Sequence, residues 1–314
     1  MYAIGVDIGG MSVKIGIVDG NGKILYKNRR ATADTAEKLV EIAAEQINEI
    51  LAENNVTVKD IKGIGIGCPG IIDSKKGVVK AACNLPFNEF NIVKEMKKYF
   101  DTRVKVSNDA NVAALGETFF GCASKYVNSV MFTLGTGVGG GIVIDRKIYA
   151  GGSSMGAELG HVTLVNGGVP CNCGRDGCIE AYCSATALIR QTKAKMNERK
   201  DSAMWKFVDG DIEKTDGRTA FECAKQGDEA ACEVVDNYVE YLSNAIMSML
   251  NIFRPEAFIL GGGISAQGKY LTDKIADYCA RYKYGYEGTP VPEILTATLG
   301  NDAGIIGAAA LIYA

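Results

Sequence analysis

The sequence carries the same glycine-centred hairpin pattern twice. Val6–Asp19 consists of an apolar strand, a turn at Gly9–Gly10 and a second apolar strand that ends in aspartate. Phe132–Asp145 repeats this plan, with its turn at Gly135–Gly140. One such hairpin arises easily by chance, whereas two indicate a duplicated domain. We therefore expect an α/β chain with two lobes, each built on a mixed sheet, and glycine turns that face a central cleft.

Apolar periodicity around these hairpins predicts alternating strands and helices. Residues 2–30 read as a three-stranded meander, because Asp19–Gly22 is a hairpin signal. Thr35–Glu53 keeps the i, i+3, i+4 apolar spacing of a helix with one buried face. The other predicted elements are strands at 63–67, 104–106 and 257–260, and helices beginning near Ala110, over 231–253 before Arg254-Pro255, and over 302–313.

The length of the chain also favours two lobes, because 314 residues are many for one compact core. We expect a smaller lobe of residues 1–108 plus about 300–314, and a larger lobe of residues 109–299 that includes a metal-binding segment at 161–178. No low-complexity linker separates them. The lobes are therefore expected to share crossing segments rather than a tether.

Composition and charge exclude several classes of protein. A formal net charge of -3 gives no reason to expect a nucleic-acid partner. No apolar run reaches about 18 residues, so no membrane span is expected. The first strand begins at once and leaves no room for a signal peptide. We expect a cytoplasmic protein with no membrane partner.

Three glycine-rich loops, Gly9–Gly10, Gly135–Gly140 and Gly261–Gly263, each follow an apolar strand. Glycines leave backbone N–H groups uncovered, so phosphate oxygens can approach them. Neither hairpin has the spacing of a P-loop, and neither opens a helix as a Rossmann fingerprint does. A tight turn without a ligand is an alternative for any single loop. Three loops together favour a nucleotide site.

A cluster of metal-ligating residues has the spacing H-x9-C-x-C-x4-C, from His161 through Cys171 and Cys173 to Cys178. Three thiolates and an imidazole complete a tetrahedral set for Zn²⁺ and leave no position for a catalytic water. We predict a structural zinc site. The remaining cysteines are scattered singly, and we expect small buried apolar side chains at Cys68, Cys83, Cys122, Cys183, Cys223, Cys232 and Cys279.

Four of these segments resemble motifs of the ROK family of sugar kinases and repressors, within the actin-like ATPase superfamily. Cys171–Glu180 is similar to the family's C-x-C-G-x-x-G-C-x-E signature without a mismatch. Gly156–His161 resembles G-x-E-x-G-H, Asn108–Asn111 resembles the catalytic N-D-A-N, and Leu260–Gly263 resembles the adenosine-side motif. The resemblance covers nearly the whole chain and implies the actin-like, ribonuclease H-like fold.

The resemblance also implies an activity: ATP-dependent phosphorylation of a hexose at its 6-hydroxyl, with glucose favoured, in a homodimer or homotetramer. It implies that Asp109 is the general base and that sugar hydroxyls bind Asn84, Asn108, Asp109, Glu158, His161 and Glu180. It places ATP phosphates and Mg²⁺ at Asp7, Gly9, Gly10, Ser12, Lys14, Gly135, Thr136 and Gly137, and adenosine at Gly261, Gly262 and Gly263.

Elementary chemistry agrees with these roles. Attack of an alcohol on a γ-phosphate needs positioning, charge neutralisation and a proton acceptor. A carboxylate at the start of a helix beside a phosphate cleft, as expected of Asp109, can accept that proton. Glu158 and Glu180 flank the metal-binding segment and suit vicinal hydroxyls. The zinc would then be a scaffold that fixes this side of the sugar pocket.

Two departures from the family pattern leave alternatives open. Met11 stands where family members commonly have threonine, and residues 86–90 lack a tryptophan often found there. One alternative is a kinase for N-acetylmannosamine, fructose or allose. Another is a sugar-responsive repressor, although repressors carry a helix-turn-helix before the first strand and Asp7 follows only six residues. A third, resting on Met11 alone, is an inactive sugar-binding scaffold.

Overall fold

The computed structural model describes residues 1–82 and 84–314, so Cys83 lies outside the described residues. The chain divides into two compact units. Unit 1 comprises residues 1–129, 141–157 and 298–314, and unit 2 comprises residues 130–140 and 158–297. The polypeptide therefore passes between the units at four points in the sequence, and no separate linker is needed.

Two five-stranded sheets have the same strand order. The first sheet runs β3 (Ile24–Ala31), β2 (Ser12–Val18), β1 (Tyr2–Ile8), β4 (Ile61–Cys68), β8 (Val104–Asn108). The second runs β11 (Lys147–Ile148), β10 (Val138–Ile144), β9 (Ser129–Leu134), β12 (Ala257–Gly261), β13 (Glu293–Thr296). Each is a meander of three consecutive strands followed by two later ones. The duplication predicted from the hairpins is confirmed.

The other elements fill the intervals between these strands. A three-stranded sheet, which the sequence did not predict, is made by β5 (Ile71–Asp73), β6 (Val78–Ala81) and β7 (Asn88–Phe90). The helices are α1 (Ala36–Glu53), α2 (Ile92–Met96), α3 (Asp109–Phe120), α4 (Glu180–Cys183), α5 (Ala185–Glu198), α6 (Ala203–Phe207), α7 (Thr219–Lys225), α8 (Glu229–Phe253), α9 (Lys269–Tyr282) and α10 (Ala303–Tyr313). Short 3₁₀ turns lie at Val58–Asp60, Leu159–His161, Ile212–Lys214, Gly263–Gln267 and Gly300–Asp302.

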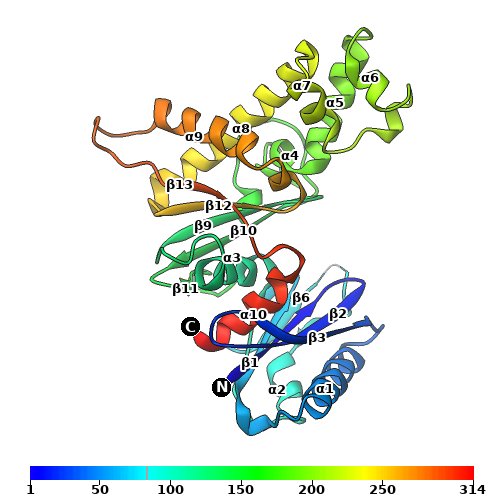
Figure 1. The fold of residues 1–314 in the computed structure, drawn as a ribbon, viewed down its shortest axis with the longest axis vertical. Coiled ribbons are helices and arrows are strands. Elements are labelled where there is room, and N and C mark those ends of the chain that lie inside the picture. Colours follow the sequence, from blue (N-terminus) through cyan, green and yellow to red (C-terminus); the bar gives the residue numbers. More distant parts are fainter. Residues whose placement is uncertain (83) are drawn as a thin grey trace. The chain divides into compact units, whose positions relative to one another are not determined.

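In unit 1, α10 packs against the first sheet at backbone distance (Figure 1). A Cβ added at Gly5 of β1 would lie 1.9 Å from the carbonyl oxygen of Ile305, and one added at Gly65 of β4 would lie 1.7 Å from that of Ala308. Glycine is therefore required at both positions. The opposite face of the sheet packs on α1, with Ile4 and Val6 fully buried.

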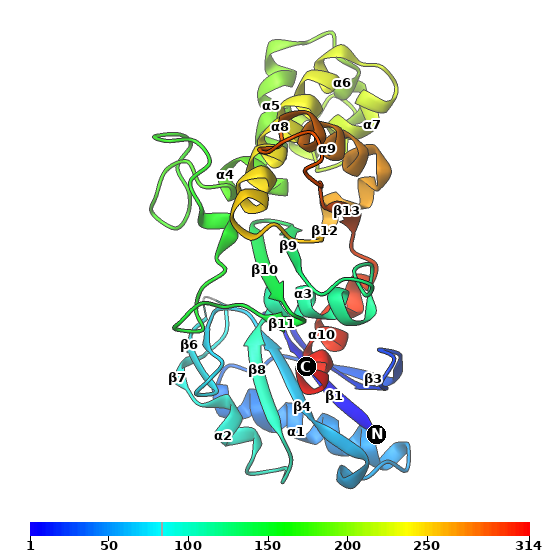
Figure 2. The same ribbon diagram turned by 90° about the vertical axis from the view of Figure 1, so that its left-hand side faces the viewer.

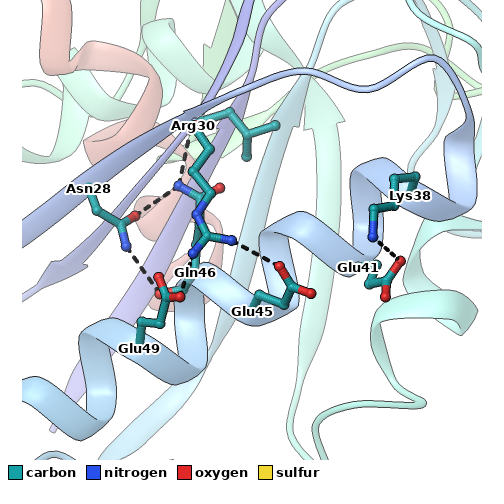
Figure 3. A network of polar contacts seen from close by, with 8 residues as sticks. Asn28, Arg30, Lys38, Glu41, Glu45, Gln46 and Glu49 are labelled. Carbon is teal, nitrogen blue, oxygen red and sulfur yellow. Dashed lines mark hydrogen bonds and ion pairs between the residues drawn. The ribbon is translucent and has the colours of Figure 1, made fainter.

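At the outer edge of unit 1, polar contacts hold α1 against β3 (Figure 3). Arg30 binds Glu45 at 2.9 Å and also Glu49, and Gln46 donates to Oδ1 of Asn28 at 3.0 Å. Helix α1 begins as predicted, because the side chain of Thr35 accepts a hydrogen bond from the Lys38 N–H. The exposed ion pairs each contribute at most about 1 kcal/mol, so the buried face of α1 holds it in place.

In unit 2, α8 is the central helix and contacts α4, α5, α7 and α9 (Figure 2). It ends where predicted, because Arg254 adopts a left-handed conformation (φ 43°) just before Pro255. The hydroxyl of the fully buried Tyr238 donates to the Cys183 carbonyl at 2.7 Å. This bond joins α8 to α4, which directly follows the cysteine cluster.

The units do not divide where the lobes were expected to divide. The expected boundary follows Asn108, whereas α3 packs within unit 1 against α10. A Cβ at Gly116 would lie 2.9 Å from Cα of Gly307, which shows how closely these two helices approach. The boundary between lobes at Asn108 stays a prediction.

The scattered cysteines follow the expectation in part. Cys68, Cys183, Cys223 and Cys279 are buried, while Cys122 and Cys232 are partly exposed. Cys83 lies outside the described residues. In the part of the chain that the structure describes, no helix combines the length and the apolar character that crossing a membrane requires.

Candidate functional site

Unit 1 places Asn108 and Asp109 at the junction of β8 and α3. Asn108 is the N-cap: its side-chain oxygen accepts from the N–H groups of Ala110 (2.9 Å) and Asn111 (3.4 Å), and its amide donates to the Gly70 carbonyl at 3.1 Å. These bonds fix the start of α3 and hence the direction of Asp109. Most of the hydrogen-bonding capacity of Asn108 is therefore used by the fold.

The carboxyl group of Asp109 has the properties of a proton acceptor. Its Oδ1 accepts from the Ala110 N–H at 2.9 Å, which leaves Oδ2 for another group. The side chain is accessible to solvent, yet the protein around it removes enough water to raise the pKa of Asp109 above its ordinary value. The negative charge of Asp7 raises it further, while the bond from Ala110 opposes the rise. A raised pKa makes a carboxylate a stronger base.

The first glycine turn, Gly9–Ser12, joins β1 to β2 and is closed by a bond from the Gly9 N–H to the Ser12 carbonyl at 2.9 Å. Thr32, just after β3, holds it: its hydroxyl donates to the Gly10 carbonyl at 3.1 Å and its N–H to the Met11 carbonyl at 3.4 Å. Met11 is 82% exposed. Asn84 lies beside the turn, since a Cβ at Gly10 would be 3.6 Å from its Cβ.

Charged side chains gather next to this turn. Asp7 forms an ion pair with Lys14 at 3.1 Å, and Lys27 forms one with Asp302 at 2.8 Å. The cavity here has a volume of about 650 Å³ and is lined by Gly9, Gly10, Met11, Ser12, Lys14, Lys27, Asn28, Arg29, Asn301, Asp302 and Ile305. The excess of cations suits phosphate oxygens. Sequence reasoning missed Lys27, Arg29, Asn301 and Asp302, because the fold brings them together from segments that are far apart in the sequence, with Lys27 and Asp302 separated by 275 residues.

The second glycine turn, Gly135–Gly137, joins β9 to β10 in unit 2 and is closed by a bond from the Gly135 N–H to the Gly137 carbonyl at 3.0 Å. The third glycine loop packs on the end of β9. Gly262 has a φ of 81°, and a Cβ there would lie 2.4 Å from the Leu134 carbonyl oxygen. The structure therefore brings together the two loops of unit 2 that were predicted to bind nucleotide.

The four predicted zinc ligands form one cluster, with their ligand atoms all within 4.8 Å of one another. Sγ of Cys171 lies 3.7 Å from Nδ1 of His161, and the sulfurs of Cys173 and Cys178 are 3.6 Å apart. A tetrahedron with Zn–S bonds of about 2.3 Å has edges of about 3.8 Å. The separations of 3.7 and 3.6 Å are close to this edge length, so the arrangement of these side chains suits a zinc ion. Because Nδ1 faces the sulfurs, Nε2 of His161 is the nitrogen left for another ligand.

The electrostatics of the cluster also suit a cation. Burial, followed by the neighbouring thiols of Cys173 and Cys171, raises the pKa of Cys178 to about 12. A divalent cation at the centre would stabilise the thiolates instead. Gly177, which lies between Cys173 and Cys178, must be a glycine. Its φ is 78°, and a Cβ there would lie 1.6 Å from the Val165 carbonyl oxygen.

Glu180 lies between the cluster and the second glycine turn. Its Oε1 is 3.6 Å from Sγ of Cys171, and its Oε2 accepts from the Val138 N–H at 3.0 Å. Glu158 and His161 share one short turn, in which the His161 N–H donates to the Glu158 carbonyl at 3.1 Å. Of the predicted sugar ligands, unit 2 therefore carries Glu158, His161 and Glu180, while unit 1 carries Asn84, Asn108 and Asp109.

The chain is similar to known proteins over nearly its whole length. The family model described as ROK family matches residues 3–314. The glucokinase of Thermotoga maritima is 38% identical, over 98% of this chain and 96% of its own length. The xylose repressor of Caldicellulosiruptor bescii is 30% identical, over 87% of this chain and 69% of its own length.

Solved structures give the same result. The ROK family glucokinase from Streptomyces griseus, crystallised with glucose and AMPPNP, has a TM-score of 0.79 and 34% identity, with 99% of each chain covered. The ROK hexokinase from Thermus thermophilus has a TM-score of 0.80 and 30% identity, with 100% of this chain and 98% of that chain covered.

Proposed function

Since this chain belongs to the ROK family and has the actin-like ATPase fold of its glucokinase structures, we propose that it is an ATP-dependent glucokinase that phosphorylates glucose at the 6-hydroxyl. The observation that carries the proposal is the likeness, over 99% of both chains, to a glucokinase that binds glucose and AMPPNP. The fold class expected from the sequence is confirmed by the same structures.

Asp109 would be the general base. Its Oδ2 would accept the proton of the 6-hydroxyl as the sugar oxygen attacks the γ-phosphorus of ATP. The new O–P bond forms as the bond from the γ-phosphorus to the bridging oxygen breaks, and ADP leaves. The raised pKa of Asp109 and its fixed position at the start of α3 support this role.

The donor phosphates would be bound by backbone N–H groups of the two glycine turns, with Ser12 and Lys14 beside the first. Asp7 is the residue that would hold Mg²⁺, which neutralises phosphate charge when bound. Its carboxylate lies two residues before Gly9 in the sequence and is paired with Lys14 at 3.1 Å. Gly261, Gly262 and Gly263 would contact adenosine.

The sugar hydroxyls would bind Asn84, Asn108, Glu158, His161 and Glu180. Zn²⁺ would be held by His161, Cys171, Cys173 and Cys178, and the fit of their ligand atoms supports this. With four protein ligands the ion has no open position, so its role would be to fix His161 and Glu180. The homodimer or homotetramer and the cytoplasmic location stay predictions.

A substrate panel tests the proposal. Purified protein with MgATP would be assayed for ADP release with glucose, fructose, allose, mannose and N-acetylmannosamine, ranked by kcat/KM. We expect glucose to rank first. A higher kcat/KM for N-acetylmannosamine, fructose or allose would move the function to that sugar. No turnover with any of them would contradict the kinase assignment and favour a binding or regulatory role.

A further inference from the structure

The second glycine turn is held from one side by the residues that open α5. The Ala185 N–H donates to the Gly135 carbonyl at 2.8 Å, and the Thr186 hydroxyl donates to the Thr136 carbonyl at 2.8 Å. Ala185 and Thr186 are the first two residues of α5, and all of these groups belong to unit 2. Two successive carbonyl groups of the turn are therefore directed toward α5.

Peptide geometry then fixes where the N–H groups of the turn point. In a trans peptide the C=O of one residue and the N–H of the next point in opposite directions. With the carbonyls of Gly135 and Thr136 bound to α5, the N–H groups of Thr136 and Gly137 face away from it. Within residues 1–82 and 84–314 these two N–H groups have no hydrogen-bond partner. Adjacent N–H groups that face the same way form a concave anion site.

We propose that Thr186 is a positioning residue for the phosphate donor. Its hydroxyl holds the Thr136 peptide so that the Gly137 N–H stays directed at a phosphate oxygen of ATP. Thr186 itself does not contact the phosphate. Its side chain is exposed, so the hydroxyl serves the turn rather than the packing of the core. This role rests on the proposed ATP-dependent function.

The first glycine turn supplies an independent parallel. There the hydroxyl of Thr32 donates to the Gly10 carbonyl, and its N–H donates to the Met11 carbonyl. Thr32 follows a strand, whereas Thr186 opens a helix. Two turns at matching places in the duplicated sheets thus use a threonine hydroxyl and a backbone N–H on successive carbonyls, although the supporting elements differ. Different elements thus hold two successive carbonyl groups in each turn, which indicates that the orientation of the turn's peptide groups matters.

A pair of matched variants tests this proposal. Thr186→Val removes the hydroxyl and keeps the shape of the side chain, while Thr186→Ser keeps the hydroxyl. The dissociation constant of Mg-AMPPNP would be measured by calorimetry, together with kcat and KM for ATP, the affinity for glucose, zinc content and Tm. We expect Thr186→Val to weaken AMPPNP binding and to lower kcat/KM for ATP by about 3- to 10-fold, as expected for one lost neutral hydrogen bond. Glucose affinity and zinc content should not change, and Thr186→Ser should behave as wild type.

Three outcomes would overturn the proposal. Thr186→Val could bind AMPPNP as tightly as wild type, Thr186→Ser could lose as much affinity as Thr186→Val, or Tm could fall with nucleotide affinity unchanged. Thr186→Ala serves as a second variant if the valine variant does not fold. A wild-type protein that binds AMPPNP without phosphorylating glucose would contradict the proposed sugar, and the affinity series would still decide the role of Thr186.

Discussion

The two glycine turns occupy matching places in sheets of the same strand order, but their surroundings differ. The first lies among charges: Asp7 with Lys14, and Lys27 with Asp302, beside a cavity of about 650 Å³. The second is held by neutral bonds from Ala185 and Thr186 and by the carboxylate of Glu180. Duplication has kept the backbone turn and its peptide orientation, whereas the side-chain chemistry has diverged.

This difference suggests that the two units have different roles in the reaction. On the proposed function, unit 1 supplies the charged groups for chemistry at the phosphate, including Asp7 and Asp109, whose negative charges repel each other. Unit 2 contains a turn fixed by the segment that follows the cysteine cluster. Substitutions that disturb these charged groups of unit 1 should therefore act mainly on kcat, and substitutions in the cluster and turn of unit 2 mainly on the binding of sugar and nucleotide.

The largest effect is expected for the base. Asp109→Asn should lower kcat by about 10²- to 10⁴-fold, because the 6-hydroxyl loses its proton acceptor. Glucose affinity and Tm should stay close to wild type, since the substitution keeps the shape of the side chain and removes a charge that Asp7 opposes. Steady-state kinetics and calorimetry with glucose measure both quantities. Asp101→Asn, on an exposed residue of the same unit, is the control.

The pH profile of the wild type tests the same assignment. Because the base must be ionised and its pKa is raised, activity should fall on the acid side at a higher pH than an ordinary aspartate would give. An acid limb at the ordinary aspartate value, or more than about a tenth of wild-type kcat in Asp109→Asn, would show that another group accepts the proton.

The next effect concerns the space beside Asp7. A Cβ at Gly304, the second residue of α10, would lie 2.5 to 2.7 Å from the carboxyl atoms of Asp7. Gly304→Ala should therefore displace that carboxylate and its ion pair with Lys14. A misplacement of about 1 Å in such a site costs about 10²-fold in rate, so we expect a loss of that order in kcat.

The matched control is Gly20→Ala, where an added Cβ meets no atom within 4 Å. It should leave kcat and Tm unchanged. Both variants would be compared at saturating glucose over a range of Mg²⁺ concentrations, and Gly304→Ala should need more Mg²⁺ for half-maximal rate. Unchanged kcat and Mg²⁺ dependence in Gly304→Ala would show that the position of Asp7 is not critical.

Loss of the zinc ion should weaken the binding of ligands by unit 2. Cys173→Ala removes an exposed ligand and leaves no buried cavity. We expect zinc affinity to fall by at least about 10-fold and glucose affinity to fall with it, because the cluster fixes His161. Glu180 contacts both Cys171 and the Val138 N–H, so the second glycine turn should loosen too. Nucleotide affinity should therefore fall, by less than glucose affinity.

Metal analysis and separate titrations of glucose and AMPPNP measure these effects. Cys232→Ala, in the same unit but outside the cluster, should retain full zinc and both affinities. Full zinc occupancy in Cys173→Ala would contradict the ligand assignment. Unchanged glucose affinity after metal loss would contradict the scaffold role.

Local pattern predicted the elements of this fold well. The start of α1 at Thr35, the end of α8 before Pro255 and the repeated meander all depend on periodicity and caps within one segment. The cluster of one histidine and three cysteines was predictable for the same reason: its four side chains lie close together in sequence, and their chemistry permits few alternatives.

Contacts between distant segments were not predictable from pattern. Thr186 was missed because its partner, the Thr136 carbonyl, lies on a different element and is a backbone group. Glu117 was missed because glutamate in a helix is usually solvated. Here it is fully buried and accepts from the N–H groups of Thr298 and Leu299 at 2.8 Å. It thereby fixes the segment that leads into α10. The short strands β5, β6 and β7 were missed because they are too brief to show alternation.

The smallest expected effect concerns Met11 in the first glycine turn. Met11 is 82% exposed in the turn Gly9–Met11, which contains no hydroxyl, whereas the turn Gly135–Gly137 contains that of Thr136, one place earlier. Met11→Thr would add a hydroxyl group that can donate a hydrogen bond to the phosphates of ATP, and it would not change the buried core. One neutral hydrogen bond corresponds to about a 2- to 10-fold change, so KM for ATP should fall by that amount with Tm unchanged.

Met11→Val is the matched control, because valine has the shape of threonine without the hydroxyl. Any change common to both variants comes from removing the methionine, and the difference between them isolates the hydroxyl. If the first turn binds phosphate through its backbone and the charges beside it alone, Met11→Thr and Met11→Val will have the same KM for ATP. That result would show that the first turn needs no hydroxyl. The first turn would then depend on its backbone and on neighbouring charges, whereas the second turn is held by neutral hydrogen-bond donors. A lower KM in Met11→Thr alone would instead show that a hydroxyl in the first turn strengthens the binding of ATP.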